Sequence, residues 1–123
     1  LKAVAVLGPF THVDEPVVGT DNFDFMMEGV ANLVAVQADA TYGPDYHASS
    51  DTFDKVDLPQ LRKNAAVVAA VLWGFAEADA PWGRQTGEQV QKLVETTTLK
   101  DQMVSFGVFD DWRSGKRGRK AAR

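Results

Sequence analysis

The chain has 123 residues, of which 45% are hydrophobic and 24% charged, an ordinary composition for one globular domain. It contains no cysteine, which excludes disulfide frameworks, thiolate metal sites and a cysteine nucleophile. The net charge of −4 combines −10 over residues 1–112 with +6 over residues 113–123, and so acidic a body disfavours nucleic acid as a partner.

The first residues predict a strand. Residues 2–8, KAVAVLG, form a short Val-rich run that Gly8-Pro9 ends, and a second short strand is possible at Val17-Val18. The chain starts without a methionine or a signal-like segment. We therefore expect the true N-terminus, and any targeting signal, to lie upstream.

A short helix and a buried strand are expected next. Within residues 19–29, Thr20 or Asp21 can cap a helix and Gly29 can occupy its C′ position. The run ANLVAVQ, residues 31–37, has a continuous apolar centre. Such a centre is typical of a strand covered on both faces, as in a parallel α/β sheet.

A long polar loop over residues 39–57 leads into the strongest helix pattern of the sequence. Asp57 and Gln60 can form a capping box, and Pro59 suits a first helical turn. We expect a helix over about 58–78 that is buried on nearly all sides. One of its faces carries apolar residues in steps of three and four: Leu58, Leu61, Ala65, Val68, Leu72 and Phe75.

The remaining segments predict helices and a tail. After a proline-containing turn, residues 86–96 and 98–105 have amphipathic patterns, and FGVFDDW, residues 106–112, is expected as a short extended piece. The basic tail, residues 113–123, is expected to be disordered. No apolar run approaches the ~20 residues that span a bilayer, so no membrane span is expected.

These elements predict an α/β fold that is incomplete. Two or three strands rarely support a helix buried on all faces. We therefore expect residues 1–112 to form the C-terminal portion of a larger domain, associated with a missing N-terminal portion or with a second copy through the exposed face of the helix.

Candidate chemistry centres on the segment YHASSDT, residues 46–52. A histidine with an acid close in sequence, here His47 with Asp51, can be a metal ligand oriented by that acid. A lone histidine in a polar loop is more often simply solvated, and spacing alone favours this second interpretation.

The order of segments from Gly19 to about Asp79 shifts that balance. GTDNFDFMMEGVANLVAVQ, a loop, YHASSDT, DKVD and an alanine-rich helix resemble the C-terminal segment of the co-catalytic zinc exopeptidases. This family includes bacterial leucyl aminopeptidases and plasma glutamate carboxypeptidase. The resemblance implies the C-terminal part of a three-layer zinc-peptidase fold.

The resemblance also implies roles for individual residues. His47 matches a ligand of one of two zinc ions, while Asp51, followed by Thr52, matches an acid that shapes the loop, either as a structural group or by orienting the metal ligand. Asp21 matches an acid of the substrate cleft. Many aminopeptidases have a histidine at the next position, where Asn22 stands here, and this difference favours the carboxypeptidase-like branch.

Two tyrosines lie near the proposed ligand in sequence. Tyr46 directly precedes His47, and Tyr42 lies four positions further upstream. Both could hydrogen-bond to a reaction intermediate in the cleft, a role assigned from this closeness alone.

Most of the implied site is missing from this chain. The other zinc ligands and the general base lie, in the family, upstream of the matching segment. His12, Asp14 and Glu15 stand where the family has no ligand, and we expect them to be surface residues. The 123-residue chain should therefore contact at most one zinc ion, contain no catalytic base and be inactive alone.

Two functions remain at this point. In the first, the complete protein is a zinc exopeptidase acting on peptides or dipeptides. In the second, the fold is a non-catalytic interaction module whose basic tail contacts anionic partners. His47 favours the enzyme, and a nucleic-acid binder is the third choice. Location stays open, and only the resemblance implies an extracytoplasmic protein.

Overall fold

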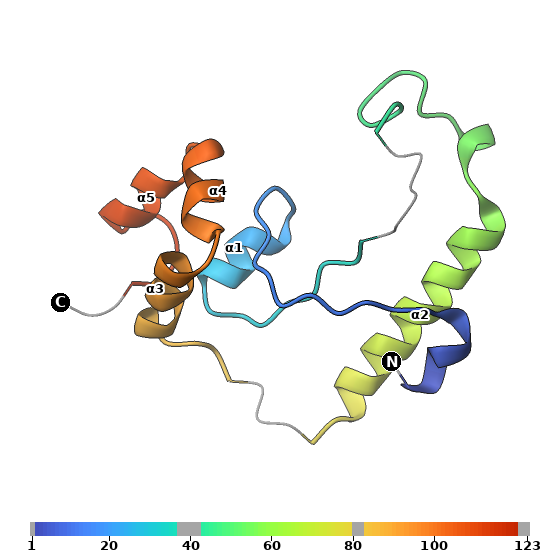
Figure 1. Cartoon of the computed structure of the whole chain (residues 1–123), viewed down its shortest axis with the longest axis horizontal. Helices are drawn as coiled ribbons and strands as arrows, with labels where there is room; N and C mark the ends of the chain where they lie inside the picture. Colours follow the sequence, from blue (N-terminus) through green and yellow to red (C-terminus); the bar gives the residue numbers. More distant parts are fainter. Residues whose placement is uncertain (1, 37–42, 80–82, 121–123) are drawn as a thin grey trace. The chain divides into compact units, whose positions relative to one another are not determined.

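The computed structural model describes residues 2–36, 43–79 and 83–120, and within these ranges the regular elements are all helical (Figure 1). The chain divides into two compact units. Unit 1 comprises Leu1–His12 and Val36–Ala80, and unit 2 comprises Val13–Ala35 and Pro81–Arg123. None of the described helices has both the length and the apolarity that crossing a membrane requires.

The predicted α/β class is wrong, because no residue in the described ranges belongs to a β-strand. The first expected strand is instead the 3₁₀ element η1, Lys2–Leu7, which is kinked at Val4. Val17-Val18 and the described residues of the second run, 31–36, lie outside any regular element. A strand needs a neighbour for its backbone N–H and C=O groups, and these segments have none within the described chain.

In unit 1, η1 contacts the long helix α2, Leu58–Glu77, and the short 3₁₀ element η2, Phe53–Lys55, precedes it. The predicted start of α2 is confirmed, since Asp57 Oδ1 accepts from the Gln60 backbone N–H at 2.9 Å. The other half of the expected capping box is absent. Gln60 Nε2 donates forward to Asn64 Oδ1 at 2.7 Å.

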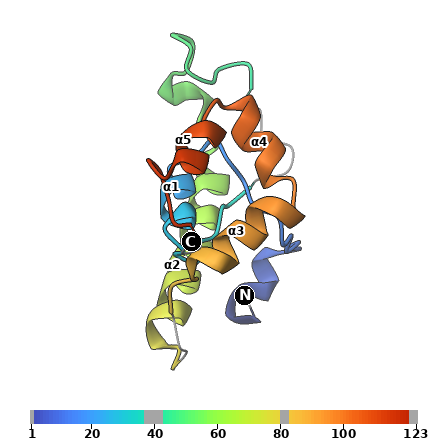
Figure 2. The same ribbon diagram turned by 90° about the vertical axis from the view of Figure 1, so that its left-hand side faces the viewer.

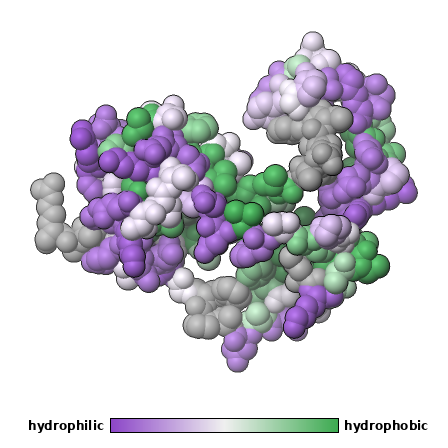
Figure 3. Space-filling model, viewed as in Figure 1, coloured by the Kyte–Doolittle hydropathy of each residue, from purple (hydrophilic) through white to green (hydrophobic). Residues whose placement is uncertain are grey.

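The expected burial of α2 is not found. None of its residues is buried, and Leu72 and Trp73 expose 64% and 70% of their surface. Apolar residues consequently reach the surface in the region where α2 lies (Figure 3). The reason is that η1, which contacts α2, has only six residues and is too short to cover a helix of 20 residues.

Unit 2 is a cluster of four helices around one core (Figure 2). The helices are α1, Asn22–Met27; α3, Gly87–Thr96; α4, Leu99–Ser105; and α5, Phe109–Ser114. The expected helices over 86–96 and 98–105 are thus confirmed. The buried core consists of Val18, Phe23, Met26, Met27, Val90, Val94, Leu99, Met103 and Trp112.

Helix α1 ends as its sequence predicts. Gly29 is at C′ with φ of +77°, its N–H donates to Met26 O at 2.9 Å, and the Val30 N–H donates to Phe25 O at 2.9 Å. These two bonds form a Schellman motif. The Gly29 carbonyl then accepts from the Gln85 N–H at 2.8 Å, which ties α1 to the segment before α3.

The expectation for residues 106–112 is wrong, because this segment starts α5 and contributes Trp112 to the core. The basic tail, expected to be disordered, is described as far as residue 120. Its backbone returns to α1 and α5: the Arg119 N–H donates to Met27 O at 2.7 Å, and Trp112 Nε1 donates to Arg119 O at 3.1 Å.

Candidate functional site

His47 lies at the tip of a tight turn in unit 1. The Ala48 N–H donates to Asp45 O at 3.0 Å, which places Tyr46 and His47 at the two central positions. His47 has φ of +55°, and it is the one non-glycine with a positive φ in the described part of the chain. Histidine tolerates this region better than most residues, although at some cost.

The imidazole of His47 is accessible. The residue is exposed, and its ring lies 4.0 Å from the ring of Tyr46, centroid to centroid. Within the described chain the imidazole neither donates nor accepts a hydrogen bond. Both ring nitrogens are therefore open to an added partner, as a metal ligand requires.

An ion pair closes the base of this loop. Lys55 Nζ lies 3.0 Å from Asp45 Oδ1 and also donates to the Ser50 carbonyl. Hydrogen bonds from Ser50 and Lys55 lower the pKa of the Asp45 carboxyl below its usual value. The turn that carries His47 is thus held by its own neighbours within unit 1.

Asp51 and Thr52 lie on the same loop, but within the described residues their side chains make no hydrogen bond or ion pair with His47. The Asp51 N–H donates to Ala48 O at 3.1 Å, and Thr52 Oγ1 donates to Ser50 O at 3.2 Å. These bonds shape the loop after His47, but the Asp51 bond uses the backbone and does not test the role implied for its carboxylate. Their role toward a bound metal stays a prediction.

The proposed cleft residues divide between the units. Tyr46 is in unit 1 and is 52% exposed, whereas Asp21 and Asn22 are in unit 2. Asn22 Nδ2 donates to Val17 O at 3.3 Å and to Asn32 Oδ1 at 3.1 Å. The Asn22 amide thus holds the loop before α1, and a role for Asn22 in the cleft stays a prediction. Tyr42 lies outside the described residues.

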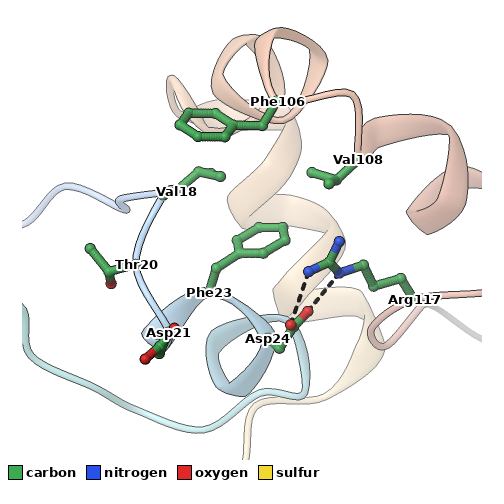
Figure 4. Close-up of a pocket in the computed structure, with 9 residues that line it drawn as sticks. Val18, Thr20, Asp21, Phe23, Asp24, Phe106, Val108 and Arg117 are labelled. Atoms are coloured by element: carbon green, nitrogen blue, oxygen red, sulfur yellow. Dashed lines mark hydrogen bonds and ion pairs between the residues drawn. The ribbon is translucent and has the colours of Figure 1, made fainter. Parts of the chain in front are cut away.

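Asp21 occupies the N-cap position of α1 without a capping hydrogen bond from its side chain. It lines a pocket of about 270 Å³ in unit 2 (Figure 4). Phe106, Val108 and Arg117 line the same pocket, and sequence reasoning missed all three. No local signal could have found them, because Arg117 is 93 positions away from its ion-pair partner Asp24.

The described residues do not form a metal site. No group of three or more His, Cys, Asp or Glu residues among them could hold an ion. His12, Asp14 and Glu15 are exposed, and Glu15 Oε2 accepts from Thr98 Oγ1 at 3.3 Å. A zinc ion takes four ligands in a closed site, or three and a water in a catalytic one. The described part of the chain therefore does not fit a complete zinc centre.

Comparison with known protein families identifies a relationship. The family model of peptidase family M28 matches residues 4–72, a segment that contains the His47 loop and most of α2. Curated proteins and solved structures gave no match. Because the family model covers more than half of the chain, the chain belongs to peptidase family M28, whose members are generally zinc-dependent hydrolases of peptide bonds.

Proposed function

We propose that this chain is part of a zinc-dependent exopeptidase that removes terminal residues from peptides or dipeptides. In this proposal His47 supplies one ligand to one of two zinc ions, and the other ligands and the general base lie outside this chain. The 123 residues by themselves are then inactive. The observation that carries the proposal is the M28 match, because it spans the segment that presents His47.

The geometry of the loop supports the role of His47. A ligand must present a free ring nitrogen at a fixed position, and the Asp45–Lys55 ion pair fixes the base of this turn. His47 has a left-handed backbone conformation, which glycine adopts without strain and histidine adopts at some cost. A residue kept in such a conformation is a reasonable candidate for function.

The identity and the hydrogen bonds of Asn22 support the carboxypeptidase-like branch. Many aminopeptidase-like members have a histidine at this position. The Asn22 amide group instead holds Val17 and Asn32. We therefore infer that substrate recognition beside Asp21 does not use this side chain.

The ion pairs of the basic tail disfavour the alternative, a non-catalytic module that contacts anionic partners. Four of its cations already face carboxylates of the same unit: Arg113 with Asp110, Lys116 with Asp111, Arg117 with Asp24 and Arg119 with Glu28. Lys120 lies 5.5 Å from the Trp112 ring centroid. Most of the cations in the described part of the tail, residues 113–120, are therefore already paired within unit 2.

The first test is a calorimetric zinc titration of the full chain, of His47→Ala and of His12→Ala, in buffer freed of chelators. His12 is the matched control because it is the other histidine of the chain and is also exposed. We expect weak zinc binding that His47→Ala removes and His12→Ala leaves unchanged. Peptidase assays with dipeptides should show no turnover for any of the three.

Two results would contradict this proposal. Tight, stoichiometric zinc binding by the wild-type chain would show that its own residues complete a site. Binding that His47→Ala leaves unchanged and His12→Ala abolishes would show that His12, and not His47, is the ligand.

A further inference from the structure

The exposed apolar residues of α2 form one continuous stripe. Leu58, Leu61, Ala65, Val68 and Leu72 follow one another in steps of three and four, and the four larger ones are between 40% and 64% exposed. Residues at this spacing lie on one side of a helix. One side of α2 therefore presents apolar side chains over most of its length.

The other side of α2 faces the rest of unit 1. Lys63, Val67 and Ala70 are half-buried, and helical geometry places them opposite the stripe. The short element η1 contacts α2 within this unit. Because the rest of unit 1 half-covers the side away from the stripe, it leaves the stripe itself open to a partner.

The spacing of the stripe is that of a helix that packs against another helix. Steps of three and four average about 3.5 residues, the repeat that keeps one seam facing a partner helix. Small residues alternate with large ones, because the exposed Ala69 and Ala76 lie beside Leu72 on the same side of α2. A large side chain of one helix can then fill the space over a small one of the other.

The charges of α2 run opposite to those that its own dipole favours. Arg62 lies near the N-terminal end and Glu77 in the last turn, whereas acids stabilise a helix N-terminus and cations its C-terminus. Neither residue makes an ion pair within the described ranges. In an antiparallel pair of such helices, the basic end of one would lie beside the acidic end of the other.

We propose that α2 binds a second copy of itself in antiparallel orientation through this stripe. The stripe is complementary to itself, as a two-fold interface requires, and this property assigns it to a second copy of the chain. In the register that we propose, each large residue faces a small one of the other copy: Leu61 faces Ala76, Leu72 faces Ala65, and Val68 faces Ala69. The proposal concerns unit 1 alone and depends neither on zinc nor on His47.

The same register brings the unpaired charges together. Arg62 lies within about 3 Å of Glu77 of the second copy along the helix axis, and both residues are on the same flank of the stripe. An interface along one side of a 20-residue helix belongs to the smaller class of specific interfaces, so we expect a Kd in the micromolar range. Below this concentration the chain is a monomer with an exposed stripe.

Sedimentation equilibrium of the full 123-residue chain tests the proposal, in low-salt buffer that contains a chelator. We expect a reversible change from monomer to dimer between about 1 µM and about 500 µM. Ala69→Arg should raise the Kd at least about hundredfold, because two like charges then meet at the centre of the seam. Ala66→Arg is the matched control, since Ala66 is also exposed but lies off the stripe, and it should change the Kd by less than about twofold.

Charge exchange tests the antiparallel orientation. Arg62→Glu and Glu77→Arg should each raise the Kd about tenfold, because both ion pairs of the dimer become like-charge contacts. A mixture of these two variants should regain the wild-type Kd within about threefold, since opposite charges meet again at both ends. In a parallel pair Arg62 would face its own copy, and neither single change would weaken the dimer. Lys63→Glu, on the opposite side of α2, is the control for charge alone.

Four results would overturn the proposal. A monomer at every concentration, with freely exchanging α2 amides, would show that the stripe binds no second copy. A monomer with protected α2 amides would show that another part of the same chain covers the stripe. A dimer that Ala69→Arg leaves intact would place the contact elsewhere. A dimer that neither charge variant weakens would exclude the antiparallel orientation. The zinc titration, which reports on His47, is independent of all four.

Discussion

The two units of this chain differ in what their helices achieve. Unit 2 has short helices, of six to ten residues, yet they bury nine apolar residues in one core. Unit 1 has the longest helix, and none of the residues of α2 is buried. Helix length and apolar content are therefore poor guides to which part of the chain is stably folded.

The difference shows that an apolar helix needs a complementary surface. In unit 2, α1, α3, α4 and α5 each give one face to a common centre, and apolar burial supplies most of the stability of such clusters. In unit 1, η1 supplies one small contact surface to α2. We propose that α2 is covered by residues outside this chain, from a further portion of the same domain or from a second copy, and its apolar stripe favours the second copy.

The largest expected effect comes from a matched pair of leucine substitutions, one in each unit. Leu99 is fully buried in α4, and Leu72 is 64% exposed in α2. We expect Leu99→Ala to lower the free energy of unfolding of unit 2 by about 2–5 kcal/mol. At concentrations where the chain is a monomer, Leu72→Ala should change the stability of unit 1 by no more than about 0.5 kcal/mol.

Amide hydrogen exchange measures the two units separately, with α3–α4 reporting on unit 2 and α2 on unit 1. A large loss of protection in α2 after Leu72→Ala would mean that this helix is covered in solution. The contrast between the units would then disappear.

A second pair of substitutions tests how tightly the segment before α3 packs against the end of α1 in unit 2. A Cβ at Gly29 would lie 2.4 Å from Gln85 O, and a Cβ at Gly107 would meet nothing within 4 Å, while both residues have positive φ. Gly107→Ala should cost about 1 kcal/mol of unfolding free energy for its backbone conformation alone. Gly29→Ala should cost at least about 1 kcal/mol more, because the clash is with backbone.

Thermal or urea unfolding of both glycine variants, followed at Trp112, provides the comparison. If the two substitutions had equal effects, the segment containing Gln85 would not be fixed against the end of α1. This contact of unit 2 would then be looser in solution.

The smallest expected effect concerns the tail. A hydrogen bond from Arg117 lowers the pKa of Asp24, so the pair contributes stability above the unfolded carboxyl pKa of about 3.9 and loses it as the pH falls through the lower folded value. Because Asp24 is well exposed, Asp24→Asn should cost less than about 1 kcal/mol at neutral pH.

The pH profile distinguishes this pair from a general charge effect. The stability difference between wild type and Asp24→Asn should vanish in acid, whereas Asp110→Asn, which breaks an exposed pair within α5, should change little at any pH. A wild-type advantage that persists below the folded pKa of Asp24 would rule out the ion pair as its source.

Helix boundaries were predictable where their signals lie within one turn of the chain. Asp57 and Pro59 set the start of α2, Gly29 sets the end of α1, and the apolar spacing of residues 86–105 gives the buried faces of α3 and α4. The prediction of strands was wrong because an apolar run such as KAVAVLG does not reveal whether a neighbouring strand is present to pair with it.

The candidate site was predictable in part for the same reason. His47 stood out by its polar context and by the family motif, both of which are local. The pocket was not predictable, since Phe106 and Arg117 reach it from segments that have no sequence signal in common with α1. The contacts of the tail were not predictable either, because charge counts do not show which carboxylates its cations meet.

The sequence by itself determined the positions of α1, α2, α3 and α4, the family and the proposed ligand His47, because capping, periodicity and motifs act over a few residues. Only the tertiary structure decided which apolar residues are buried, where the cations of the tail bind and that Phe106 and Arg117 form a pocket with Val18. These features depend on distances between segments up to 93 positions apart, which no local pattern encodes.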